Sequence, residues 1–217
     1  MQSEKNSYTT LKAEVVHTAE YVEKRSRFIA ALTQVTTPEQ AQAFIDSVRV
    51  QHYDARHHVY AYRLSDGFCK ASDDGEPQRT AGFPTLDVLK GQDLQDVCCV
   101  VTRYFGGTLL GPGGLVRAYT TATQRACEAA RTAGDLQIMG LCVYVRCQVS
   151  YALYERVARM AMDAGASQVD AQFAADVEVT FLFEAGTQAA FLQTLEDLFA
   201  GEKPYEVSDP VFVARSV

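Results

Sequence analysis

The stretch that most constrains the fold of this chain runs from Val97 to Tyr119, with the sequence VCCVVTRYFGGTLLGPGGLVRAY. Its first six residues are almost all apolar, which predicts a buried strand, and a helix is expected to begin near Leu115. Between them, five glycines fall within nine residues: Gly106, Gly107, Gly111, Gly113 and Gly114. Glycine is needed where φ is positive or where another group approaches the backbone. The loop therefore requires a specific geometry.

A strand, a glycine loop and a helix start can together direct backbone N–H groups at an anion. Arg103 and Arg117 flank the loop, and a guanidinium suits the oxygens of a phosphate. The alternative is a purely structural loop that closes a strand–helix connection. Neither the Walker pattern GxxxxGKS/T nor the dinucleotide pattern GxGxxG fits, so any anion would be held by backbone N–H groups and the two arginines.

Acidic residues are concentrated in the second part of the chain. Residues 1–134 hold 15 Lys/Arg and 15 Asp/Glu, whereas residues 135–217 hold 5 and 12, which accounts for the net charge of −7. A nucleic-acid surface needs a basic patch. We therefore expect any such surface in the first part, and only locally.

The chain is long enough for two domains, and its 47% hydrophobic residues can form packed cores. Ala133-Gly134-Asp135 follows a predicted helix and precedes a strand. We place the boundary there, which gives domains 1–134 and 135–217, and we assign the chain to the α+β class.

The second domain is predicted to be ferredoxin-like, with the order βαββαβ. Its expected elements are strand 136–149, helix 151–164, strand 167–173, strand 176–183, helix 187–199 and strand 206–214. The first domain is expected to contain strands 10–21 and 27–35, helix 38–50, strand 57–64, helix 80–89, strand 94–103 and helix 115–131. Nothing in the second domain resembles a catalytic motif.

Six cysteines are present without any CxxC pair: Cys69, Cys98, Cys99, Cys127, Cys142 and Cys147. This spacing argues against a zinc site and a disulfide framework, and favours reduced thiols. No apolar run approaches the roughly 20 residues that span a bilayer, and the polar start MQSEKNSYTT lacks a secretory signal. We expect a cytoplasmic protein without membrane contact; its oligomeric state is not indicated.

Three carboxylates, Asp73, Asp74 and Glu76, fall within four residues of a predicted turn. They have three possible uses. Their oxygens could hold Mg²⁺ or Ca²⁺, they could cap backbone N–H groups of the turn, or they could form ion pairs with Arg103 or Arg117.

His57 and His58 are neighbours on a predicted strand, so they face opposite sides of the sheet and cannot share a metal ion. Structural histidines are the simpler interpretation. Ser26 and Arg27 could face the same groove as the glycine loop, or could protect a sheet edge from pairing. No nucleophile–base pair is recognisable, which argues against a covalent hydrolase.

Several motifs together resemble the YigZ/IMPACT family: Ser26–Ile29, His58–Arg63, Ser72–Pro77, Thr80–Gly82, Val100–Gly107 and Leu110–Tyr119. The resemblance covers roughly residues 10–131, and the bacterial arrangement with a second small domain covers the rest. It implies a first domain like that of a small-subunit ribosomal protein and the fourth domain of the translocating elongation factor. It implies a second domain like that factor's ferredoxin-like fifth domain.

The resemblance also implies a link to translation, since eukaryotic relatives act in translational control by competing for a scaffold protein. We therefore predict a non-catalytic regulator without a cofactor that binds RNA, the ribosome or a translation-associated protein. The expected anion or nucleic-acid site comprises Ser26, Arg27, His58, Arg103, Tyr104, Phe105, Gly106, Gly107, Gly111, Gly113, Gly114 and Arg117. The alternative is a metal-dependent enzyme acting on a phosphorylated small molecule or nucleotide, with Asp73, Asp74 and Glu76 as ligands.

Overall fold

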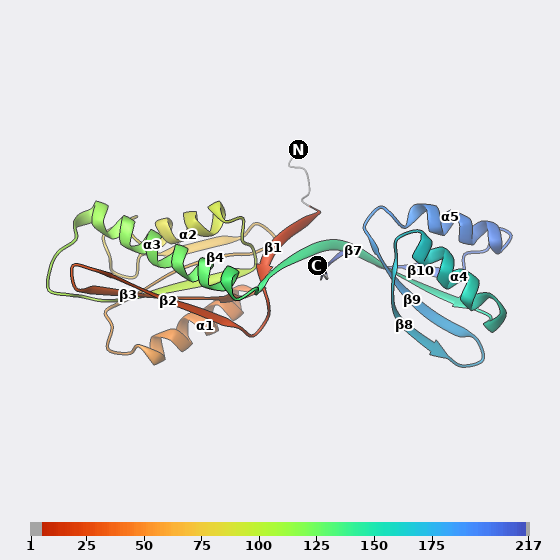
Figure 1. Cartoon of the computed structure of the whole chain (residues 1–217), viewed down its shortest axis with the longest axis horizontal. Helices are drawn as coiled ribbons and strands as arrows, with labels where there is room; N and C mark the ends of the chain where they lie inside the picture. Colours follow the sequence, from red (N-terminus) through yellow and green to blue (C-terminus); the bar gives the residue numbers. More distant parts are fainter. Residues whose placement is uncertain (1–5, 216–217) are drawn as a thin grey trace. The chain divides into compact units, whose positions relative to one another are not determined.

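The computed structural model describes residues 6–215 and divides them into two compact units (Figure 1). Residues 8–138 form the first unit, and residues 139–215 together with Asn6 and Ser7 form the second. The division lies within strand β7 (Leu136–Val149), which starts just after the boundary expected from the sequence. The two-domain α+β class is confirmed.

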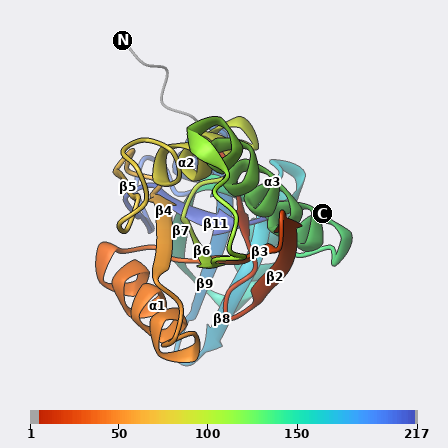
Figure 2. The same cartoon turned by 90° about the vertical axis from the view of Figure 1, so that its left-hand side faces the viewer.

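The first unit is built on a five-stranded antiparallel sheet with the order β2-β3-β6-β4-β5. Its strands are β2 (Val16–Glu23), β3 (Ser26–Gln34), β6 (Val97–Tyr104), β4 (His57–Arg63) and β5 (Cys69–Ser72). Helices α2 (Gly82–Gly91) and α3 (Gly111–Thr132) cover one face, and α1 (Pro38–Gln51) covers the other (Figure 2). Strand β1 (Ser7–Leu11) is joined to the unit by a bridge between Thr9 and Leu94.

Strand β6 lies at the centre of the sheet, and helices cover both of its faces. Its residues are therefore buried on both sides, which accounts for the continuous apolar run in the sequence. Cys99 belongs to the core beneath α2 and α3, whereas Cys98 belongs to the core beneath α1. The two neighbouring cysteines thus point to opposite sides of the sheet, as predicted from strand alternation. All described cysteines are free thiols.

The second unit has the ferredoxin-like arrangement. After β7 come α4 (Tyr151–Asp163), β8 (Ser167–Phe173), β9 (Val177–Glu184), α5 (Ala189–Leu198), β10 (Tyr205–Val207) and β11 (Val211–Ala214). The antiparallel order β10-β7-β9-β8 is the order of a split βαβ sheet. Phe181, Phe183 and Phe191 are fully or almost fully buried in its core.

Three expected elements differ in detail from the structure, and one short strand was not expected. The predicted strand 10–21 is two strands, because Glu14 between them adopts a positive φ of 62°. The predicted strand 206–214 is likewise divided into β10 and β11, and the four-residue strand β5 was not predicted. Helix α3 begins at Gly111 instead of near Leu115, since Pro112 suits the first turn, where its missing N–H is not needed.

Within residues 6–215, no helix is both long and apolar enough to cross a membrane.

Candidate functional site

Four connections meet at one end of the first unit's sheet, where β3 and β4 begin and β6 ends (Figure 2). They are residues 24–25, 52–56, 73–81 and 105–110. We call this region the loop end. It contains the glycine loop, the three clustered carboxylates and most of the residues that the sequence singled out.

Beneath the loop end lies a buried ion pair. Arg103 Nη1 on β6 donates to Glu76 Oε1 over 2.7 Å, and the exposed fractions of the two side chains are 7% and 3%. The Tyr119 hydroxyl on α3 donates to the same carboxylate oxygen over 2.8 Å. Burial and the adjacent carboxylate raise the pKa of Tyr119 well above its ordinary value, so the hydroxyl stays protonated and donating.

Arg103 is therefore turned inward and does not join an exposed anion site. Its guanidinium lies over the rings of Phe28, at 5.4 Å, and Phe105, at 5.6 Å, in cation–π geometry. Of the proposed uses of the acidic residues, an intramolecular ion pair with Arg103 is the one realised for Glu76. Arg117 has no ion-pair partner among the described residues.

Asp73 and Asp74 have other partners. Asp73 accepts hydrogen bonds from the backbone N–H groups of Arg79, Ala81 and Gly82, which places a negative charge at the start of α2. Asp74 accepts from Arg49, over 3.2 Å, and from the backbone N–H of His58. The three carboxylates thus contact three separate sets of groups. In residues 6–215, no three His, Cys, Asp or Glu side chains are grouped as metal ligands would be.

The histidines of the loop end hold its backbone together. His58 is buried, and its Nε2 lies 3.0 Å from the His52 carbonyl oxygen. His57 Nδ1 lies 2.9 Å from the Asp74 carbonyl oxygen. His52 Nδ1 lies 3.0 Å from the Tyr104 hydroxyl, and burial, followed by the charge of His58, lowers the pKa of His52.

One glycine of the loop is needed for a close approach of two backbones. A Cβ on Gly106 would lie 2.1 Å from the Arg25 carbonyl carbon and 2.3 Å from the Ser26 nitrogen. The Gly106 N–H donates to the buried Ser26 Oγ over 3.1 Å, and Arg25 Nη2 donates to Thr108 Oγ1 over 3.4 Å. The glycine loop is therefore attached to the β2–β3 hairpin, and Ser26 is part of that attachment.

Gly107 and Gly111 are needed for a different reason, since their φ angles are +85° and +70°. Gly113 has open space around its Cβ position, and Gly114 meets only the Leu110 side chain, at 3.0 Å. A close backbone contact or a positive φ therefore explains why Gly106, Gly107 and Gly111 are glycines, but it does not explain Gly113 or Gly114.

The hairpin between β2 and β3 turns through only two residues, because Glu23 pairs with Ser26. These two residues are Lys24, with φ 45°, and Arg25, with φ 66°. Two-residue hairpins with positive φ at both positions favour Asn-Gly, since other side chains are strained there. The chain thus places two long basic side chains where backbone energetics alone would favour small residues.

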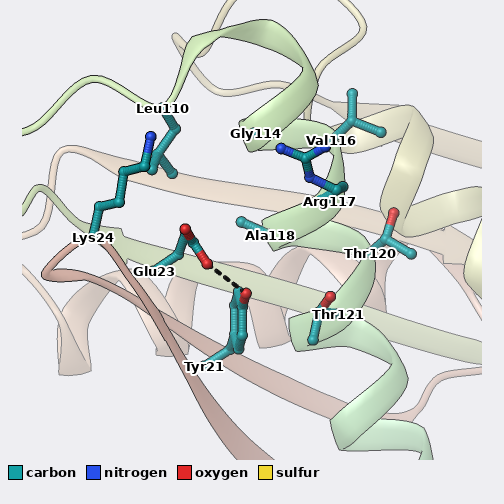
Figure 3. A pocket seen from close by; sticks show the side chains of 10 residues that line it. All are labelled: Tyr21, Glu23, Lys24, Leu110, Gly114, Val116, Arg117, Ala118, Thr120 and Thr121. Atoms are coloured by element: carbon teal, nitrogen blue, oxygen red, sulfur yellow. Dashed lines mark hydrogen bonds between the residues drawn. The ribbon is translucent and has the colours of Figure 1, made fainter.

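Beside the hairpin lies an open cavity with a volume of about 440 Å³ (Figure 3). Lys24 reaches it from the hairpin and Arg117 from α3, and neither has an ion-pair partner in the described part of the chain. Tyr21 and Glu23 line the cavity, joined by a 2.8 Å hydrogen bond. The remaining lining residues are Leu110, Gly114, Val116, Ala118, Thr120 and Thr121.

Arg27 and Tyr104 face the other side of the sheet. They are cross-strand partners, and the Arg27 guanidinium lies 5.7 Å from the centre of the Tyr104 ring. Arg27 also forms a bidentate, exposed ion pair with Glu20, in which both N–O distances are 3.0 Å. The charge of Arg27 is therefore partly balanced by Glu20 on the neighbouring strand β2.

The structure thus separates the expected site residues into two groups. Ser26, His58 and Arg103 are buried and support the loop end from within, whereas Phe105 and Arg117 are exposed on it. Lys24 and Arg25 were not expected as site residues. Their signal in the sequence is a pair of basic residues at the point where one predicted strand ends and the next begins.

Two domain models match the chain. Residues 24–127 match the Impact N-terminal domain, and residues 147–202 match a domain of unknown function, DUF1949. The chain is similar to IMPACT family member YvyE of Bacillus subtilis (strain 168), with 51% identity over 116 residues, 52% of either chain. It is also similar to IMPACT family member YigZ of Escherichia coli (strain K12), with 46% identity over 110 residues, 48% of this chain and 52% of YigZ.

These matches span about half the length of each curated relative. A solved structure, described as the crystal structure of a hypothetical protein, covers more of the chain. It has a TM-score of 0.63 and 30% identity, and the likeness covers 93% of this chain and 96% of that one. With an Impact N-terminal domain followed by a DUF1949 domain, and with identities of 46–51% to named members, this chain belongs to the IMPACT family.

Proposed function

We propose that this chain regulates translation by binding, and that its loop end binds RNA. Family membership supports the link to translation through the eukaryotic relatives described above, which act in translational control. The loop end supports the choice of RNA, because its unpaired cations are gathered on a molecule whose overall charge is negative.

One observation carries the choice of RNA: both residues of the β2–β3 turn are basic and have positive φ. A left-handed backbone costs a non-glycine residue about 1 kcal/mol or more. Strain of this kind is typically retained where the side chain serves a purpose other than folding. Basic side chains at the tip of a hairpin are well placed to contact phosphates.

Arg117 adds a third cation to those of the Lys24–Arg25 turn, and we call these three residues the basic surface. It lines the same cavity as Lys24, but it is carried by a different element, so the two cations are held on opposite walls. Arg125 lies nearby on α3, with its guanidinium 4.9 Å from the Tyr21 ring centre and its Nη1 donating to the Glu20 carbonyl. A phosphate group between the hairpin and α3 would meet the cations of Lys24 and Arg117 on either side. Glu23 also lines this cavity, where its carboxylate accepts the hydrogen bond from the Tyr21 hydroxyl.

The alternative of a metal-dependent enzyme has less support. It requires Asp73, Asp74 and Glu76 to share an ion, and these carboxylates contact the α2 start, Arg49 and Arg103 respectively. We therefore base the proposed function on the basic surface.

Co-sedimentation with ribosomes across a salt series tests this function. The test variants are Lys24→Asn/Arg25→Gly, which gives the turn its preferred residues, and Arg117→Ala. The control is Arg156→Ala/Arg159→Ala, which removes two exposed cations from α4 in the second unit.

We expect the wild-type protein and the control to associate in a salt-sensitive manner. Each lost phosphate contact should lower the slope of log K against log salt by roughly one unit. Equal binding by all variants would overturn the assignment of the loop end. Association that does not depend on salt would indicate a protein partner in place of RNA.

A further inference from the structure

Two aromatic rings project into solvent at the loop end. Tyr53, in the connection after α1, is 85% exposed, and Phe105, at the start of the glycine loop, is 53% exposed. Exposed aromatic side chains that are grouped on one surface can mark a site where another molecule binds. Both rings lie at the loop end, as the basic surface does, so one ligand could contact the rings and the cations together.

The two rings are carried by segments that are tied together. Phe105 directly follows Tyr104, whose hydroxyl donates to Asp54 over 2.9 Å and lies 3.0 Å from His52 Nδ1. The His52 and Tyr104 rings also meet edge to face, with centres 6.0 Å apart. The loop that carries Tyr53 is therefore fixed to the end of β6, next to Phe105.

Cations lie beside Phe105 and over Tyr104. The close contact of Gly106 with the Arg25 backbone places the Lys24–Arg25 turn beside Phe105. Arg27 lies over the ring of Tyr104, the residue that links Phe105 to the loop carrying Tyr53. Alternation along β6 directs Tyr104 and Arg103 to opposite faces of the sheet. Rings and cations together thus continue around the end of the sheet from the α3 side to the α1 side.

Aromatic rings interleaved with cations are the arrangement that binds single strands, because phosphates pair with the cations and unpaired bases stack on the rings. A duplex cannot use such rings, since its bases are already stacked on one another. We infer that the loop end binds a single-stranded RNA segment, with bases stacked on Tyr53 and Phe105 and phosphates at the Lys24–Arg25 turn. This inference rests on the proposed RNA-binding function.

The inference can be tested by fluorescence anisotropy with the full chain and three labelled RNA probes. They are a 12-nucleotide uridine strand, an abasic strand with the same number of phosphates, and a duplex of the same length. Tyr53→Ala and Phe105→Leu remove the rings, and leucine keeps apolar cover over Arg103. Tyr53→Phe keeps the ring, and Tyr151→Ala removes an exposed ring from the second unit as a control.

We expect Tyr53→Ala and Phe105→Leu each to weaken binding of the uridine strand by about 5- to 150-fold. Binding of the abasic strand should be unchanged, and Tyr53→Phe and Tyr151→Ala should bind as the wild type does. Lys24→Asn/Arg25→Gly should weaken the binding of both strands.

Two results would overturn base stacking while leaving RNA binding in place. One is wild-type affinity of both ring variants for the uridine strand, and the other is equal affinity of the wild-type protein for the duplex. If the wild-type protein bound neither the uridine strand nor the abasic strand at low salt, the proposed function itself would fail, and the inference with it.

Discussion

Glu76 and Arg103 form a buried ion pair across 2.7 Å, and they connect the acidic turn after β5 to the central strand of the first unit. Removing one partner of a buried pair leaves an uncompensated charge, which costs about 3–5 kcal/mol of unfolding free energy. We expect Arg103→Met and Glu76→Leu each to lose this amount in urea unfolding. The double variant should lose less than the sum of the two.

A loss below about 1 kcal/mol in either single variant would show that the pair behaves like an exposed one. Arg103 variants are therefore unsuitable for testing RNA binding. They would also disturb β6 and remove the guanidinium that packs against Phe105, so a change in binding could not be assigned to the lost charge.

The Lys24–Arg25 turn should be a position where stability and binding oppose each other. Lys24→Asn/Arg25→Gly relieves two positive-φ residues, so it should raise the unfolding free energy by about 1–2 kcal/mol. Thermal and urea unfolding would measure the gain. Lys24→Ala removes a charge but keeps the strain, so it should give no comparable gain. Destabilisation of the double variant would show that the basic side chains stabilise the fold.

Two glycines of the loop should respond to alanine in opposite directions. In Gly106→Ala, the new Cβ would lie 2.1 Å from backbone of the hairpin, so we expect strong destabilisation and displacement of the turn. Gly113 lies in the first turn of α3 with open space around it, so Gly113→Ala should stabilise the helix by up to about 1 kcal/mol. Unfolding curves of the two variants provide the comparison. Equal effects would contradict the contact between the loop and the hairpin.

Buried thiols should make the protein less stable in alkaline solution. Burial raises the pKa of Cys127 from 9.0 to about 11 and that of Cys147 to about 12. Between pH 9 and 11 the unfolded chain loses these protons while the folded chain keeps them. Stability present below pH 9 should therefore fall as the pH rises through this range.

The measurement is urea unfolding at pH 8, 9 and 10, with Cys127→Ala as the comparison. The unfolding free energy of the variant should decrease less with pH than that of the wild-type protein.

The six thiols should differ in reactivity. In a thiol titration of the native protein at pH 8, partly exposed Cys69 should react first, and Cys69→Ser should abolish the fast phase. A fast phase that persists in this variant would contradict the burial of the remaining described thiols.

The sequence by itself determined most of the secondary structure, because each long element carries its own periodicity. The apolar run of β6 indicates a strand covered on both faces, and the second domain's alternating and helical patterns give the order βαββαβ. Short or irregular elements were missed where the local signal is weak. The four residues of β5 lack a clear alternation, and the break at Glu14 depends on one backbone angle.

Only the tertiary structure decided which residues of the motifs face solvent. Glu76 is separated from Arg103 by 27 positions and from Tyr119 by 43. Charge alone could not select Arg103 over Arg117 as its partner. The fold buries one arginine and exposes the other because β6 lies at the centre of the sheet, whereas the Arg117 side of α3 faces outward. Composition fixes how many charges the chain carries, but packing fixes which of them are neutralised within it and which remain for a ligand.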